Sequence, residues 1–288
     1  MQLLIRARVF GAATLACVLG LVGCTPFHFD DQNVDLLLDH EGDRLELRIQ
    51  YNDVRSPSDS VHDREKATSS LQRILAKDRL IVLYDMPFDF DEPRVEGEPG
   101  TEEERMLREE LDAILEGFSV LGAGATLLDE GRPSIWQRIE LQNVQRTVAA
   151  MNRGINYLVQ SEVSVGADGV WDEATLRTWT EKAEENGPWI VVDERGLVVR
   201  IPMSPHTLAR VLVQLTDPEA EQHEREFAFE LLGPMSEFRV IDGTVELIYA
   251  PDEAGVIHWN LSRNDLGIDT PIDQHIVESD WFQAALGQ

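Results

Sequence analysis

Basic residues are scarce in this chain. It has 25 Lys and Arg against 53 Asp and Glu, a formal net charge of −28 over 288 residues. Nucleic-acid binding depends on clustered Lys and Arg that contact phosphates, and adhesion to anionic lipid depends on a polybasic patch. The composition therefore argues against both. Solubility and mutual repulsion are the simplest explanation of the acidity, with a basic partner or bound divalent cations as alternatives.

Long uncharged hydrophobic runs are also missing. Val9–Gly23 is apolar over fifteen residues, whereas a membrane-spanning helix needs about 20. No window after Cys24 approaches about 18 apolar residues without charges. Arg6 and Arg8 precede the run, and a short basic start before about 7–15 apolar residues is typical of a secretory signal peptide. A buried core helix is the alternative for this segment.

The end of this run resembles the lipobox of bacterial lipoproteins, in which an aliphatic residue and two small or medium residues precede a cysteine. The matching residues are Leu21, Val22, Gly23 and Cys24. Cys17 fits less well, because Thr14 stands where the aliphatic residue belongs. The resemblance covers about 25 residues, and it bears on the anchor and the compartment alone.

The lipobox resemblance implies cleavage between Gly23 and Cys24 and a covalent lipid on Cys24. Residues 1–23 would be a signal peptide, and the anchor would hold the mature protein at a bacterial membrane, on the extracytoplasmic side. Thr25 is not the Asp that some Gram-negative sorting systems use for inner-membrane retention, which favours the outer membrane in such a cell. Cys24 would then be the last cysteine, which excludes disulfides, cysteine metal sites and thiol nucleophiles from the mature chain.

Motifs for catalysis or cofactor binding are absent from the sequence. No G-x-S-x-G occurs, and the seven histidines form no H-E-x-x-H or other close ligand pair. Ser204-Pro205-His206 is better explained as a helix N-cap, and His258 as a strand residue. We therefore expect no enzyme, no catalytic residue, no metal site and no cofactor besides the lipid. Paired carboxylates stay open, because 53 acids produce many chance pairs.

Two further stretches have simple structural explanations. The acids Asp85, Asp89, Asp91 and Glu92 lack the spacing and the glycine of an EF-hand loop, so we expect a solvated loop. The stretch 122–125, Gly-Ala-Gly-Ala, lacks the Lys-Ser/Thr of a phosphate loop. A lone G-x-G inside a strand is typical of a bulge or of a close backbone approach.

The segment 166–175 resembles the turn of the small helical peptidoglycan-binding domains. The matching residues are Asp168, Gly169, Val170, Trp171 and Thr175. The segment departs from the family at Asp172, where the family has Gly, and at Lys182, where it has an aromatic residue. The resemblance implies peptidoglycan binding through Asp168, Gly169, Trp171 and Thr175. A plain Asp-Gly turn followed by Asp172 as helix N-cap explains the same residues.

Hydrophobic periodicity predicts an α+β fold, with mixed or antiparallel sheets, several β-hairpins and amphipathic helices packed on them. Three hairpins share an acidic–glycine turn, at Gly42, Gly196 and Gly243. Helices are expected to begin near residues 61, 101, 144, 172, 204, 218 and 279, and 86–100 is expected to be a loop. The expected divisions are a lipid-anchored tether at 24–33, an N-terminal ββαβαβ-like subdomain at 34–131 and a C-terminal α+β subdomain at 132–288.

Three hypotheses for the function follow. The first is a lipid-anchored, non-enzymatic binding or structural module that meets another protein of the cell envelope. The second is peptidoglycan binding through 166–175. The third is an envelope enzyme whose carboxylates converge only in the fold.

Overall fold

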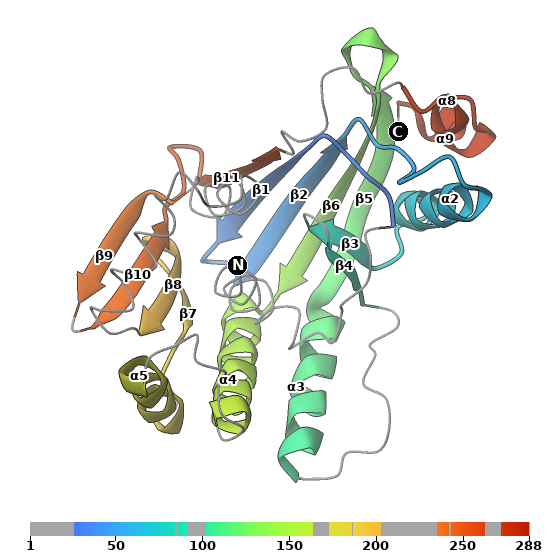
Figure 1. Cartoon of the computed structure of the whole chain (residues 1–288). Coiled ribbons are helices and arrows are strands. Elements are labelled where there is room, and N and C mark those ends of the chain that lie inside the picture. The colour runs from blue at the N-terminus through green and yellow to red at the C-terminus, as the bar shows by residue number, and fades with distance from the viewer. Residues whose placement is uncertain are drawn as a thin grey trace, which may run out of the picture. The chain divides into compact units, whose positions relative to one another are not determined.

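The computed structural model describes residues 26–83, 86–90, 102–163, 173–185, 187–202, 235–241, 243–262 and 272–287. Antiparallel sheets and helices make up this part of the chain, which confirms the α+β class. The chain divides into two compact units (Figure 1). We call them the five-stranded unit and the four-stranded unit, after their sheets, and describe each by itself.

The five-stranded unit is built on one sheet, and we call the face on which α2 packs the covered face (Figure 1). Helix α2 contacts β3, β5 and β6, so α2 and the β3–β4 ribbon lie on that face. The sheet order is β11 (Val256–Ser262), β1 (Asp31–Asp39), β2 (Arg44–Asn52), β6 (Pro133–Gln142) and β5 (Phe118–Leu127). The other elements are α2 (Val61–Leu75), β3 (Leu80–Leu83), β4 (Met86–Asp89), the 3-10 turn η1 (Asp129–Gly131), α8 (Gln274–Val277) and α9 (Asp280–Ala285).

The first predicted hairpin is confirmed as β1 and β2. Val34 lies opposite Ile49 and Leu36 opposite Leu47, so apolar side chains from both strands share the covered face. Ser60 caps α2 by accepting a hydrogen bond from the backbone N–H of Asp63, as the sequence predicts. The apolar spacing of that helix buries Ala67, Leu71 and Ile74 against the sheet.

The folded body begins earlier than expected. Phe27 and Phe29 are fully buried and pack against Tyr51, with ring centroids 5.5 and 5.7 Å from the Tyr51 ring. Between them, His28 exchanges two backbone hydrogen bonds with Arg55, at 2.8 and 2.9 Å. The expected tether at 24–33 is therefore wrong for residues 26–33, because two aromatic rings in this stretch complete the core.

A buried polar network joins β3 to the sheet beneath it. The Tyr51 hydroxyl donates to Gln137 Oε1 (2.9 Å) and accepts from the backbone N–H of Val82 (3.1 Å). Gln137 Nε2 donates to the Leu80 carbonyl (3.0 Å), and Gln32 Nε2 to the Val82 carbonyl (2.6 Å). These side chains give buried backbone groups of β3 the partners that a neighbouring strand would otherwise supply.

The expected loop at 86–100 is wrong at its start. Residues 86–89 form β4, which pairs antiparallel with β3, as Ile81 lies opposite Phe88 and Val82 opposite Pro87. Proline at position 87 suits a short two-stranded ribbon, where one side of each strand has no ladder to complete. Residues 91–100 lie outside the described part of the chain.

The four-stranded unit packs helices on a second antiparallel sheet (Figure 1). Its core contains Ile155, Val159, Trp179, Ala183 and Trp189. The sheet order is β7 (Ile190–Asp193), β8 (Gly196–Pro202), β10 (Thr244–Tyr249) and β9 (Glu237–Ile241), and the helices are α4 (Val144–Val163) and α5 (Glu173–Glu184). A further helix, α3 (Glu102–Gly117), leads directly into β5.

The other two predicted hairpins are confirmed in this unit, as β7–β8 and β9–β10. Gly196 has a φ of 108°, and a Cβ there would lie 2.2 Å from the Tyr249 carbonyl oxygen, so both conformation and space require glycine. The helices expected near 204 and 218 lie outside the described residues.

The division into units differs from the expected boundary between 131 and 132. Strand β6 pairs with β5 from Pro133 to Leu141 and with β2 along its whole length. The turn at Glu130 thus joins two neighbouring strands of one sheet, and β11, α8 and α9 return from the end of the chain to the same unit. Turn chemistry marks where the chain reverses, but it does not show whether the next strand joins the same sheet.

None of the helices in the described residues combines the length and the hydropathy that crossing a bilayer requires.

Candidate functional site

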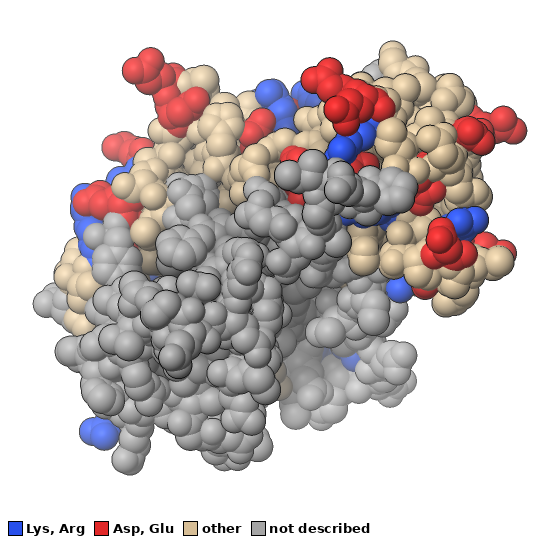
Figure 2. Space-filling view, turned by 45° about the horizontal axis from the view of Figure 1, so that its top comes forward, with Lys and Arg blue, Asp and Glu red and all other residues tan. Residues whose placement is uncertain are grey.

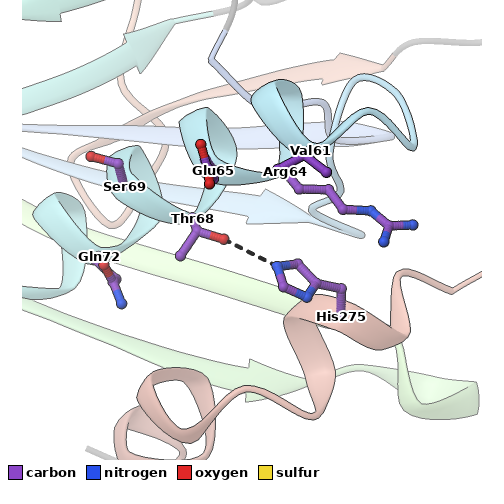
Figure 3. A pocket seen from close by; sticks show the side chains of 7 residues that line it. All are labelled: Val61, Arg64, Glu65, Thr68, Ser69, Gln72 and His275. Atoms are coloured by element: carbon purple, nitrogen blue, oxygen red, sulfur yellow. Dashed lines mark hydrogen bonds between the residues drawn. The ribbon is translucent and has the colours of Figure 1, made fainter.

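An open groove lies between α2 and α8 in the five-stranded unit (Figure 3). Its volume is about 470 Å³, within the range of about 300–1,000 Å³ that ligand pockets occupy. Six of its lining residues come from α2 and one from α8: Val61, Arg64, Glu65, Thr68, Ser69, Gln72 and His275.

The groove is assembled by helix periodicity and by one cap. The lining positions 61, 64, 65, 68, 69 and 72 recur at helical spacing on the side of α2 away from its buried residues. Asp273 fixes the other wall, because one of its oxygens accepts from the backbone N–H of His275 (3.1 Å) and of Ile276 (3.3 Å). Its second oxygen accepts from the backbone N–H of Ser56 (2.9 Å), which ties α8 to the segment before α2.

The chemistry of the groove favours binding. Thr68 Oγ1 and His275 Nε2 are 3.5 Å apart, a long hydrogen bond between two exposed or half-exposed side chains (Figure 3). Arg64 forms an ion pair with Asp59 at 2.7 Å, and Val61 at the mouth is 72% exposed. These groups offer hydrogen-bond donors, acceptors and one apolar contact to a polar partner.

A cluster of charged side chains lies near the first described residues of the five-stranded unit, before β1. Asp53 and Arg55 have side chains only 6% and 8% exposed, beside the less buried Asp30 and Arg132. Arg55 pairs with Asp30 and lies 3.5 Å from Asp53, and Arg132 bridges Asp53 (3.1 Å) and Asp30 (3.4 Å). The cluster holds together the residues before β1, the end of β2 and the turn before β6.

The cluster joins two carboxylates, as the enzyme hypothesis requires, but surrounds them with arginine. Burial and the neighbouring Asp30 carboxyl raise the pKa of Asp53 from 3.8 to about 6, although Arg55 and Arg132 lower it. With both acids ionised, two carboxylates balance two guanidinium groups. This charge balance supports a structural role for the cluster, in which it holds the residues before β1 against the end of β2.

The raised pKa of Asp53 predicts an unusual pH dependence. The folded state holds a proton on this carboxyl between about pH 4 and 6 that the unfolded chain has released, so this site loses stability as pH rises through that window. Between about pH 4 and 6, the free energy of unfolding of the wild type should fall by about 1–3 kcal/mol because of this carboxyl, since one pKa unit is worth about 1.4 kcal/mol. We expect Asp53→Asn to abolish that fall. Asn also tolerates the φ of 53° at this position. Denaturant unfolding at pH 4, 5, 6 and 7 measures it.

Asp39→Asn is the matched control. Hydrogen bonds from the Gly42 N–H and the Arg44 side chain lower the pKa of this exposed carboxyl. Asp39 stabilises the folded state above the ordinary pKa of Asp, and this stabilisation is lost as pH falls. Its pH dependence therefore has the opposite sign to that of Asp53. Equal slopes for wild type and Asp53→Asn between pH 4 and 6 would show that the Asp53 proton is not linked to folding.

Most of the residues singled out from the sequence lie outside the described part of the chain. This holds for Gly23 and Cys24, for Asp168, Gly169 and Trp171, and for Ser204 and His206. Thr175 is the third residue of α5. The lipobox and the peptidoglycan-binding turn therefore stay predictions.

Three other predicted positions are described. Asp89 pairs with Arg73 at 2.7 Å, while Asp85, Asp91 and Glu92 lie outside the described residues. His258 is an exposed residue of β11, as expected, and its Nδ1 lies 2.7 Å from Asp35. The 122–125 stretch pairs regularly with β6, and the register of β5 shifts just before it, between Val120 and Gly122.

Charged groups are spread over the described surface. Figure 2 shows Asp and Glu in separate groups, several of them beside Lys or Arg. Among the described residues, no group of three His, Cys, Asp or Glu side chains is placed to hold a metal ion.

Comparison with known proteins found no match among family models, curated proteins or solved structures.

The sequence did not predict the groove between α2 and α8. Its two walls are about 200 residues apart in the chain, at Thr68 and His275. The sequence indicates a polar face on α2 and a capping residue at Asp273, but neither feature shows that α2 and α8 lie next to each other. Only the return of the C-terminal segment to this unit brings them together.

Proposed function

We propose that this chain is a lipid-anchored protein of the bacterial cell envelope, whose body is a non-enzymatic binding or structural module. The anchor would be the lipid on Cys24, on the extracytoplasmic side of the membrane, and the outer membrane is favoured if the cell is Gram-negative. The partner would be another envelope component.

The burial of Phe27 is the observation that supports this proposal best. If Cys24 carries lipid, only Thr25 and Pro26 separate the anchor from the first core residue. Three residue steps span at most about 10 Å, since an extended chain advances about 3.3–3.6 Å per residue. Such an anchor would hold the body directly against the membrane surface, and the tether could not carry it to distant targets.

The groove between α2 and α8 supports the binding part of the proposal. It belongs to the same unit as Phe27, so a partner bound there would also be held near the membrane. Its walls present hydrogen-bonding groups from Thr68, Gln72 and His275. These suit recognition of a polar segment of another envelope protein.

Replacing Cys24 with alanine tests the anchor. We expect Cys24→Ala to lose all incorporated radiolabelled palmitate and to accumulate as an uncleaved precursor, because the residue that carries the lipid is gone. Labelling in a bacterial host, followed by gel electrophoresis and membrane fractionation, measures both effects.

Cys17→Ala is the matched control, since it removes the other cysteine of the same segment. This variant should keep its label and its processing. Palmitate that stays on the Cys24→Ala protein, or disappears from the Cys17→Ala protein, would refute the assignment of the lipid to Cys24.

A further inference from the structure

The outer face of the five-stranded sheet, opposite α2 and the β3–β4 ribbon, carries Trp136 among mostly polar residues. Along β6, Ile135, Gln137 and Ile139 are buried toward α2 and β3. Trp136 and Arg138 alternate with them and therefore lie on the outer face. Outer faces of antiparallel sheets are ordinarily polar, so a tryptophan on this one requires an explanation.

Trp136 leans over two glycines of the neighbouring strand. A Cβ added at Gly124 would lie 2.8 Å from Cζ2 of the indole, and one added at Gly122 would lie 3.4 Å from Cζ3. Gly124 is buried although it lies on the outer face, because the indole covers it. Trp136 itself is half-buried, and its indole N–H has no hydrogen-bond partner among the described residues. The indole nitrogen lies on the Gly124 side, 2.9 Å from the position of such a Cβ, and the half-buried ring keeps part of its surface exposed.

Hydrogen-bonding side chains surround the indole. Gln50 lies directly opposite Trp136 on β2 and donates to Ser134, two residues from Trp136 on β6, at 3.3 Å. Arg138, on the other side, holds both oxygens of Glu46 at 3.0 and 3.2 Å. Cross-strand neighbours are about 5 Å apart and alternate residues of one strand about 7 Å apart. The spacing matches an aromatic ring with polar groups on three sides.

The charges of the outer face cancel locally, in contrast to the acidic chain as a whole. Glu46 is shared by Arg138 and by Arg48, which lies 2.7 Å away. Asp35 lies 2.7 Å from His258 Nδ1, and the two form an ion pair when that histidine is protonated. A surface of this kind lacks the positive potential that binds nucleic acid, and its apolar area is too small to bind lipid. It complements a ligand that is nearly neutral, rich in hydroxyls and apolar on the faces of its rings.

We propose that the outer face of the five-stranded sheet, centred on Trp136, is a glycan-binding surface. A pyranose ring would pack its C–H face on the exposed side of the indole, and its hydroxyls would bond to Gln50, Arg138 and the indole N–H. This inference is independent of the lipid anchor. An anchored protein with such a surface would link the membrane to a polysaccharide of the envelope.

Co-sedimentation of the full protein, extracted from membranes in detergent, tests the proposal. The probes are purified bacterial sacculi, chitin and cellulose. We expect wild type to bind at least one of them, and Trp136→Ala to bind about tenfold more weakly or less, since stacking on one aromatic ring is worth about that factor. Trp136→Phe should bind better than Trp136→Ala. Binding to sacculi and chitin would indicate N-acetylated sugars, and binding to cellulose neutral hexoses.

Two controls separate binding from folding. Trp281→Ala removes a half-buried tryptophan of α9 and should bind as wild type does. Gln50→Ala leaves the indole and its glycines intact and should weaken binding severalfold with an unchanged circular dichroism spectrum, so the proposal stays testable if Trp136→Ala misfolds. The proposal is overturned if wild type binds none of the three polymers, or if folded Trp136→Ala or Gln50→Ala binds as wild type does.

Discussion

Replacing Phe27 with alanine should lower the free energy of unfolding of the five-stranded unit by about 3–5 kcal/mol. The ring is fully buried, and its loss removes both the transfer free energy and the contacts to Phe29 and Tyr51. The surrounding sheet is held in register by β1–β2 pairing and cannot collapse fully into the space. Denaturant unfolding followed by near-UV circular dichroism measures the loss.

The variant also tests where the folded body begins. If Phe27 anchors the start of the chain, its removal should free residues 26–30, and amide exchange at His28 and Asp30 should accelerate together with the global loss. Leu121→Ala is the control, because Leu121 is 44% exposed and lies in the same unit. We expect it to cost about 0.5 kcal/mol or less. Equal effects of the two substitutions would show that the entry of the chain does not contribute to the core.

Replacing Trp189 with alanine should cost the four-stranded unit about 3–5 kcal/mol. Trp189 is 3% exposed and packs edge-on against Trp179, with ring centroids 6.4 Å apart. Its indole N–H donates to Asn156 Oδ1, and Asn156 is buried, so the substitution also leaves a polar group without its partner. Thermal or denaturant unfolding of this unit measures the effect.

Lys182 provides an independent signal for the same substitution. Its Nζ lies 5.4 Å from the centre of the Trp189 ring, and burial lowers the pKa of the amine to about 8. Without the indole, water reaches the amine, so the pKa of Lys182 should rise toward 10.5. Titration by NMR detects that change.

Val240→Ala is the control for the four-stranded unit, because Val240 is 52% exposed on β9. It should change stability by about 0.5 kcal/mol or less and leave Lys182 unaffected. An unchanged pKa of Lys182 in Trp189→Ala would show that the indole does not shield the amine.

Local structure was predictable wherever the residues of a segment themselves determine its conformation. The hairpin of β1 and β2, the cap of α2 at Ser60 and the turn at Gly196 follow from alternation, capping and glycine chemistry within about ten residues. The same holds for α9, which the sequence predicts to begin near 279 and which is capped by Ser279, whose side chain accepts from the Phe282 N–H. The error at 26–33 lies in a short segment whose hydrogen-bond and packing partners are distant in the chain. The error at 86–89 concerns a four-residue strand that pairs with the adjacent β3 and contains a proline, so its strand signal is weak.

The sequence by itself determined the α+β class, the acidic surface and the expectation of a lipid on Cys24, because composition, periodicity and a short motif are local properties. The tertiary structure decided which strands share a sheet, where the body begins, and which side chains meet. The groove joins Thr68 to His275, the buried charge cluster joins Asp30 to Arg132, and the outer face joins Trp136 to Gly124. Each depends on the register and order of strands, which long-range packing fixes and local propensity does not.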